Sequence, residues 1–126
     1  MDSQSVLSVV VLEDEALIAL DVEDALRDAG FNVVAVMSSC AEASKWLEAN
    51  SPDIAVLDID LRDGNCVAIA RLLWDRNIPF VVHSGSSPDS GHLDPIFQKG
   101  RWVSKPSLYS ELTNAVAACA SDGSTA

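Results

Sequence analysis

Polar side chains stand directly after four aliphatic stretches of this 126-residue sequence, and their types could carry out chemistry together. In an open parallel sheet, ligands gather at the carboxyl ends of the strands. Residues that follow strand-length aliphatic runs are therefore the first candidates for a functional site. They are Glu13, Asp14 and Glu15 after the first run, Asp58 and Asp60 after the next, then His83 and Ser84, and finally Ser104, Lys105 and Pro106.

This combination of side chains suits phosphoryl transfer. Carboxylates crowded together repel one another and need a cation, and a few hard oxygen ligands suit Mg²⁺ with retained waters. An Asp carboxylate can attack phosphorus to form an aspartyl phosphate. The Lys105 ammonium and the Ser84 hydroxyl can each bind a transferred phosphoryl oxygen. The sequence thus predicts an Mg²⁺-dependent phosphoryl site at one edge of a sheet.

Hydrophobic periodicity indicates the elements that must position these residues. Continuous aliphatic runs are typical of strands covered on both faces, and apolar steps of three and four residues are typical of amphipathic helices. Strands are expected over 6–12, 31–37, 54–57, 79–83 and 101–104, and helices over 15–29, 38–50, 64–76 and 107–120. This alternation predicts an α/β fold, in which a parallel sheet carries helices on both faces.

Details of these helices can also be predicted. Ser38 or Ser39 is expected to cap the second helix, and Ser107 the last one. Trp46 and Trp74 are expected to pack between helix and sheet. Residues 85–100 hold three glycines and two prolines, so mostly loop is expected where the alternation requires a fourth helix. Residues 121–126 are small and polar and are expected to form a flexible tail.

Composition restricts the classes of function. The length suits a single domain. The chain carries 19 Asp and Glu against 8 Lys and Arg, a net charge of −11, which argues against binding nucleic acid or an anionic membrane. No apolar run approaches the roughly 18 residues of a membrane span, and we expect a cytoplasmic protein. Cys40, Cys66 and Cys119 are odd in number and lack CxxC spacing, which predicts buried thiols rather than a disulfide or zinc site.

In these motifs, the chain resembles the receiver domain of two-component response regulators over about residues 5–120. The family's acidic pair corresponds to Glu13 and Asp14, its phosphoacceptor to Asp58, its switch hydroxyl to Ser84, its Lys-Pro pair to Lys105 and Pro106, and the aromatic residue before that pair to Trp102. Residues 79–86 are similar to the Pro-Phe-x-Phe-Ala-Thr-Gly-Tyr stretch of the FATGUY single-domain receivers, including Gly85. Arg62 and Ser107 depart from the common pattern, and Ser84 stands in place of Thr.

The resemblance implies a flavodoxin-like (CheY-like), doubly wound sheet of five strands in the order 2-1-3-4-5, with a short or degenerate fourth helix. It implies Mg²⁺ bound by Asp14, Asp58 and the backbone carbonyl of Asp60, with Glu13 close by. A histidine kinase or a histidine phosphotransfer protein would phosphorylate Asp58. The phosphorylated chain, a single receiver domain over 1–126, would then signal to a downstream protein.

Three alternatives stay open. Phosphatases with an Asp nucleophile carry a second Asp two residues later, the position of Asp60, but generally need a cap domain for which this chain leaves no room. We therefore expect a phosphoacceptor and not a turnover enzyme. The chain could also be a receiver cut from a larger hybrid kinase, or a pseudo-receiver that only binds. His83 and Ser84 are not expected to form a catalytic pair, because neighbours on a strand point to opposite faces.

A conformational switch is the last expectation. Residues 86–100 are expected to be mobile before phosphorylation and ordered after it, with Trp102 shifting at the same time. The surface between this segment and the last helix would then contact the downstream protein, or a second copy of the chain in a phosphorylation-dependent homodimer.

Overall fold

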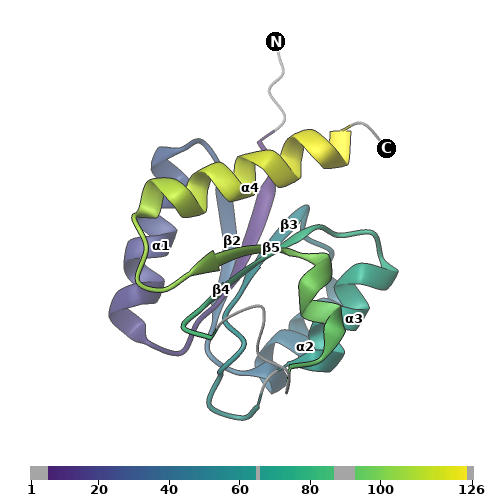
Figure 1. The fold of residues 1–126 in the computed structure, drawn as a ribbon. Coiled ribbons are helices and arrows are strands. Elements are labelled where there is room, and N and C mark those ends of the chain that lie inside the picture. Colours follow the sequence, from purple (N-terminus) through teal and green to yellow (C-terminus); the bar gives the residue numbers. More distant parts are fainter. Residues whose placement is uncertain (1–5, 65, 87–92, 125–126) are drawn as a thin grey trace.

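The computed structural model describes residues 6–64, 66–86 and 93–124. Within them, strands and helices alternate along the chain (Figure 1). They are β1 (Ser8–Leu12), α1 (Ala16–Asp28), β2 (Asn32–Met37), α2 (Cys40–Ala49), β3 (Ile54–Leu57), α3 (Val67–Asp75), β4 (Phe80–Ser84), the 3-10 helix η1 (Pro95–Lys99), β5 (Arg101–Ser104) and α4 (Tyr109–Ser124). In the described part of the chain, no helix is both long and apolar enough to cross a membrane.

The five strands form one parallel sheet in the order β2-β1-β3-β4-β5. This confirms the predicted doubly wound, flavodoxin-like sheet. The order places the ends of β1 and β3 side by side at the centre, with β4 and β5 following on one side. The residues that follow these four strands therefore meet at one edge.

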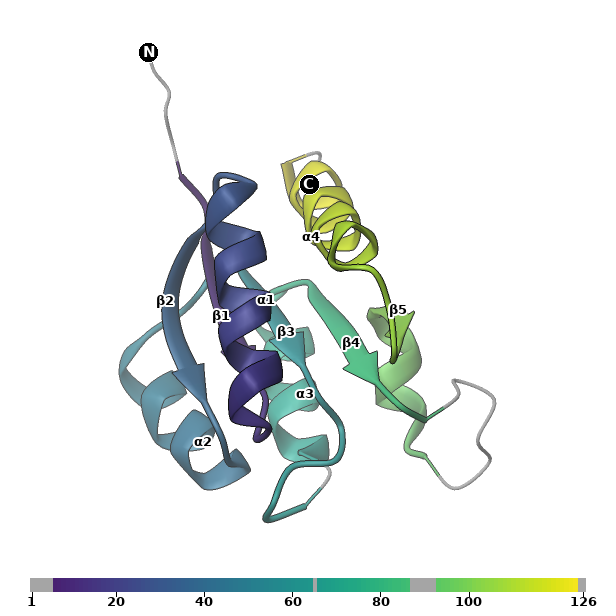
Figure 2. The same cartoon turned by 90° about the vertical axis from the view of Figure 1, so that its left-hand side faces the viewer.

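Helices cover both faces of the sheet, which explains the continuous aliphatic runs within the strands (Figures 1 and 2). Along β1, Val9 and Val11 belong to a core with residues of α1 and α4. The alternate residues, Val10 and Leu12, belong to a second core with residues of α2, α3 and η1. Since successive side chains of a strand point to opposite faces, the four consecutive positions 9–12 of β1 all need apolar side chains.

Several predicted helix boundaries move in the structure. Ser39 caps α2 as expected, since its Oγ accepts a hydrogen bond from the Glu42 N–H at 3.1 Å. The predicted cap of the last helix at Ser107 is wrong: α4 begins at Tyr109 and the Leu108 N–H donates to the Glu111 carboxylate instead. Helix α4 continues to Ser124, into the predicted tail. The third helix is shorter than predicted and begins at Val67, because residues 58–64 lie outside any helix and Cys66 has a left-handed backbone conformation.

The segment between β4 and β5 is partly anchored. Residues 87–92 of the stretch that we expect to be mobile lie outside the described residues. The degenerate fourth helix is confirmed as η1, capped by Asp94, whose Oδ1 accepts from the Ile96 N–H at 2.9 Å. Phe97 is buried in the core between η1, α3 and the sheet. The end of this segment is therefore held by packing, contrary to the expectation of a loose stretch.

The predicted state of the cysteines is wrong for two of the three. Cys40 and Cys66 form a disulfide with their Cα atoms 5.4 Å apart, and Cys119 is buried in the core as a thiol. The odd number of cysteines and the absence of CxxC spacing could not predict this bond, because folding brings together two cysteines that are 26 positions apart in the sequence. The prediction that Trp74 packs between helix and sheet is also wrong. Its side chain on α3 is 48% exposed, and the Lys99 ammonium lies 5.3 Å from its ring centre. Trp46 packs against the core as expected.

Candidate functional site

The sheet brings Glu13, Asp14, Asp58 and Lys105 together. Glu13 and Asp58 continue the hydrogen-bond ladder beyond the strand ends: the Glu13 N–H donates to the Met37 carbonyl at 2.9 Å, and the Asp58 N–H to the Leu12 carbonyl at 2.9 Å. Lys105 follows β5, and its N–H donates to the Ser84 carbonyl at 2.8 Å. Backbone hydrogen bonds thus place Glu13, Asp58 and Lys105 relative to a neighbouring strand.

Lys105 links the two buried carboxylates. Its Nζ lies 2.6 Å from Oε1 of Glu13 and 3.0 Å from Oδ2 of Asp58. Glu13 and Asp58 are 4% and 6% exposed, so this ion pair network is largely shielded from water. Burial raises the pKa of Glu13, although the hydrogen bond from Lys105 acts against it. Burial acts to lower the pKa of Lys105, but its bonds to Glu13 and Asp58 outweigh burial and raise it. The ammonium group thus stays charged next to Asp58.

Three carboxylates face one another across the site. Ligand oxygens of Glu13, Asp14 and Asp58 all lie within 4.8 Å of one another. A single ammonium cannot neutralise three carboxylates, and hard oxygen donors at such spacing suit Mg²⁺. The backbone of Asp60 is adjacent, since its N–H donates to Oδ1 of Asp58 at 3.0 Å, whereas its side chain is exposed. The donor set therefore fits the cation that the sequence predicts.

Ser84 lies on the opposite side of the site from β1. It is fully buried, and its Oγ accepts a hydrogen bond from the Ser86 N–H at 3.1 Å. Trp102 is partly buried and donates from Nε1 to the Ser86 carbonyl at 3.2 Å. Gly85 lies between Ser84 and Ser86 in the chain, and a Cβ added to it would have no atom within 4 Å other than those of its chain neighbours. The Lys105–Pro106 peptide bond is cis.

His83 and Ser84 do not act on each other. Nε2 of His83 is 3.2 Å from Oγ of Ser107, on the loop between β5 and α4, whereas the Ser84 hydroxyl binds Ser86. His83 lines a pocket of about 460 Å³ beside Lys105 and Tyr109. Burial, and then the positive charge of Lys105, lower the pKa of His83 to about 4, which keeps its ring neutral. A neutral histidine bonded to Ser107 fits the expected packing role.

Sequence reasoning assigned no role to Asp63, which the structure gives a specific one. Its carboxylate accepts hydrogen bonds from the first two N–H groups of α2, those of Cys40 at 2.7 Å and Ala41 at 3.0 Å. These bonds lower the pKa of Asp63, because they stabilise the charged carboxylate. Asp63, in the loop that starts at Asp58, therefore caps a helix whose first residue lies 23 positions earlier in the chain. No local pattern signals this contact, which joins two distant segments.

The family follows from comparison with known proteins. The sequence model of the response regulator receiver domain matches residues 9–117, which include all the residues gathered at the site. The chain belongs to the response regulator receiver family. Receiver domains are signalling domains of two-component systems, and this assignment accords with the strand order and with acidic residues at the sheet edge.

Individual relatives agree with this assignment. SdrG from Sphingomonas melonis Fr1 has a solution structure that matches with a TM-score of 0.78 and 32% identity, over 94% of this receiver and 99% of that chain. The transcriptional regulatory protein PdtaR of Mycobacterium tuberculosis is 34% identical over 76 residues, 59% of this chain and 37% of its own. The phyllosphere-induced regulator PhyR of Methylorubrum extorquens is 38% identical over 76 residues, 58% of this chain and 28% of its own. The matched part of this chain thus spans well under half the length of either regulator.

Proposed function

We propose that this receiver accepts a phosphoryl group on Asp58 in an Mg²⁺-dependent reaction and relays it as a conformational signal. The observation that carries the proposal is the buried Asp58 carboxylate, which is hydrogen-bonded to Lys105 and faces Glu13 and Asp14. Glu13, Asp14 and Asp58 carry more negative charge than the Lys105 ammonium neutralises, and a divalent cation would balance the excess and lower the repulsion that an incoming phosphoryl group meets. The phosphodonor would be a phosphohistidine of a kinase or phosphotransfer protein.

The residues have distinct tasks in the transfer. A carboxylate oxygen of Asp58 attacks phosphorus, forming the O–P bond as the P–N bond of phosphohistidine breaks. Lys105 holds its ammonium 3.0 Å from the attacking carboxylate of Asp58 and can follow the charge onto a phosphoryl oxygen. The Ser84 hydroxyl would leave the Ser86 N–H and donate to a second phosphoryl oxygen. Positioning and charge neutralisation account for most of such catalysis.

Glu13, Asp14, Asp58 and the backbone carbonyl of Asp60 would hold Mg²⁺, with water in the remaining positions. When bound, Mg²⁺ neutralises the charge that repels an incoming phosphoryl group. Glu13 also fixes the ammonium of Lys105, so its role includes orienting that cation. Pro106 and Gly85 would have structural roles and shape the backbone next to Lys105 and Ser84. Lys105 and Ser84 would themselves bind the phosphoryl group.

Exposed leucines beside the site favour a protein phosphodonor. Leu17, in the first turn of α1, is 79% exposed, and Leu108, three residues after Lys105, is 71% exposed. Leu20 on α1 is also exposed. Apolar side chains next to a reactive group are an interface feature. A helix that carries phosphohistidine could cover them while presenting its phosphoryl group to Asp58.

The chain would act in the cytoplasm, as a single receiver domain.

Acetyl phosphate with Mg²⁺ tests the proposal, followed by intact mass. The wild type should gain one transient +80 Da adduct, and Asp58→Asn should gain none while keeping its circular dichroism spectrum. Asp60→Asn is the matched control, because only the backbone of Asp60 is used: it should label like the wild type. An Asp-nucleophile phosphatase would instead turn over many equivalents and lose turnover in Asp60→Asn. A labelled Asp58→Asn protein would contradict the assignment of the acceptor.

A further inference from the structure

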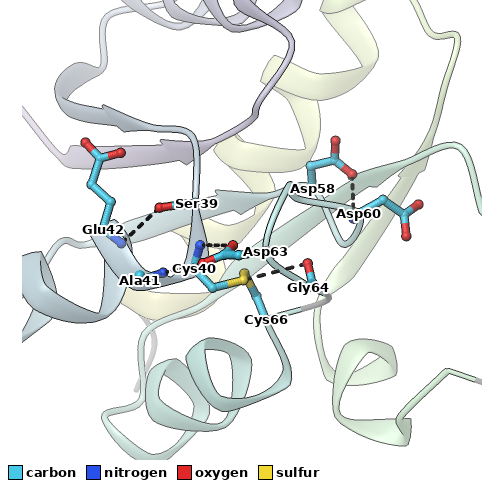
Figure 3. Close-up of a disulfide and its surroundings, with 9 residues drawn as sticks. All are labelled: Ser39, Cys40, Ala41, Glu42, Asp58, Asp60, Asp63, Gly64 and Cys66. Carbon is cyan, nitrogen blue, oxygen red and sulfur yellow. Dashed lines mark hydrogen bonds between the residues drawn. A yellow bond between two sulfur atoms is a disulfide. The ribbon is translucent and has the colours of Figure 1, made fainter.

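The Cys40–Cys66 disulfide ties the loop that follows Asp58 to the start of α2 (Figure 3). Cys40 is the first residue of α2, and Cys66 directly precedes α3. Residues 58–64 are thus attached on one side to the sheet, through Asp58, and are followed by the covalent bond at Cys66. Asp60, whose N–H donates to Oδ1 of Asp58, lies between the two attachment points.

A second link joins the same two segments. The carboxylate of Asp63 binds the N–H groups of Cys40 and Ala41. This contact does not depend on the oxidation state of sulfur, so it would keep both cysteines close after the disulfide is reduced. The Cys40 sulfur also lies 3.7 Å from the Gly64 carbonyl, to which a thiol could donate. The pair is therefore preorganised to open and close repeatedly.

The backbone of Cys66 gives reduction a structural consequence. Its φ of 57° and ψ of 34° lie in the left-handed region, which is unfavourable for a residue with a side chain. Such conformations persist only where the surroundings impose them. The disulfide is one of those constraints, and without it Cys66 can return to a preferred conformation and move the adjoining loop.

We propose that the Cys40–Cys66 disulfide is a reversible redox modification that strengthens Mg²⁺ binding by holding residues 58–64 in place. The proposal rests on the proposed function, because it concerns the same metal site. With the disulfide closed, the backbone of Asp60 is held beside Asp58 before the cation arrives. With it open, Mg²⁺ binding must also order the loop, so the affinity falls.

The chemistry is thiol–disulfide exchange with a low-molecular-weight thiol such as glutathione. A glutathione thiolate attacks the sulfur of Cys40, which is partly exposed, whereas Cys66 is 5% exposed. Cys66 leaves as a thiolate and takes a proton. A second glutathione thiolate then attacks the mixed disulfide, releasing Cys40 as a thiol and forming glutathione disulfide. Two electrons and two protons thus pass from two glutathione molecules to the protein, and the reverse reaction restores the bond.

The first measurement establishes reversibility. Protein equilibrated in glutathione buffers of varied ratio is quenched with acid, denatured, alkylated with N-ethylmaleimide and weighed as the intact chain. As the buffer becomes more reducing, the number of alkyl groups per chain should rise in one step. It should be one, on Cys119, in oxidising buffer and three in reducing buffer. Cys119→Ser should show the same step shifted by one group. A count that stays at three under oxidising buffers would overturn the proposal.

The second measurement tests the coupling in both directions. Calorimetric titration should show Mg²⁺ binding three- to tenfold more tightly to the oxidised protein than to the reduced one. Linkage then requires Mg²⁺ to shift the thiol–disulfide equilibrium constant toward the disulfide by the same factor. The Cys40→Ser/Cys66→Ser variant should bind Mg²⁺ identically in both buffers, and Cys119→Ser should keep the difference.

The outcomes separate this proposal from the one on which it rests. Equal Mg²⁺ affinity of the oxidised and reduced proteins would overturn the regulation and leave the proposed function standing. Absence of Mg²⁺ binding to either form would overturn both. A matched shift in the two equilibria, lost in the double variant, would support both.

Discussion

Ser84 and Trp102 bind opposite ends of the same residue. The hydroxyl of Ser84 accepts from the Ser86 N–H at 3.1 Å, and the indole of Trp102 donates to the Ser86 carbonyl at 3.2 Å. Ser84 ends β4, and Trp102 belongs to the neighbouring β5. A movement of Ser84 toward a phosphoryl group would break its bond to Ser86 and so alter the surroundings of the indole. The proposed switch thus has a defined physical route.

Tryptophan fluorescence should report this route. In a Trp46→Phe/Trp74→Phe background, only Trp102 emits, and beryllofluoride with Mg²⁺ should change its emission by about 10–30%, since its hydrogen-bond partner shifts. Ser84→Ala in the same background removes the hydroxyl and should abolish most of that change. An equal change with and without the hydroxyl would show that the signal reaches Trp102 by another path.

Removal of one site carboxylate should stabilise the protein when Mg²⁺ is absent. Asp14→Ala relieves repulsion with Glu13 and Asp58 and should raise the melting temperature of the metal-free protein by about 2–5 °C. It should also remove the stabilisation that Mg²⁺ gives the wild type by binding the folded state. Asp24→Ala, an exposed acid on α1, changes the net charge equally and should keep the full Mg²⁺ response. If Asp14→Ala responds to Mg²⁺ as the wild type does, Asp14 is not a ligand.

His83 should make the folded state sensitive to mild acid. Its pKa is about 4 in the folded protein, against 6.5 for the ordinary side chain. Between these values the unfolded chain binds a proton that the folded chain does not, so stability falls as the pH drops from 6.5 to 4. The full effect is about 3 kcal/mol. Urea unfolding at pH 7, 5.5 and 4.5 should show a smaller decline in His83→Gln, which can still bond Ser107. Parallel pH profiles for the two proteins would contradict a neutral buried His83.

Two glycines should respond differently to the same substitution. A Cβ added at Gly100 would lie 2.7 Å from the Phe80 carbonyl oxygen and 2.5 Å from two atoms of its buried ring. Gly100→Ala should therefore lower the free energy of unfolding by about 1–3 kcal/mol. Gly85→Ala meets no atom within 4 Å and should change it by less than about 0.5 kcal/mol. Chemical denaturation of both variants measures the contrast, and equal losses would mean that the packing against Phe80 does not limit this turn.

Local pattern was enough to predict the sheet and the members of its site. The aliphatic runs before Glu13, Asp58 and Lys105 indicated strands, and parallel strands place their carboxyl ends at one edge. The acids and the ammonium therefore had to meet, and they do, within 3.0 Å in the case of Lys105 and Asp58. Which strands lie next to each other depends on the order of the strands, which the family resemblance implied and the structure confirms.

Contacts between distant segments were decided by the tertiary structure alone. Cys40 and Cys66 pair because folding places the loop after β3 against the start of α2, where Asp63 caps the helix. Ser107 binds His83 instead of capping α4, because the loop after β5 passes over the end of β4. Periodicity specifies which face of an element is apolar. It does not specify how far apart two elements settle, and hydrogen bonds and disulfides depend on that distance to within an ångström.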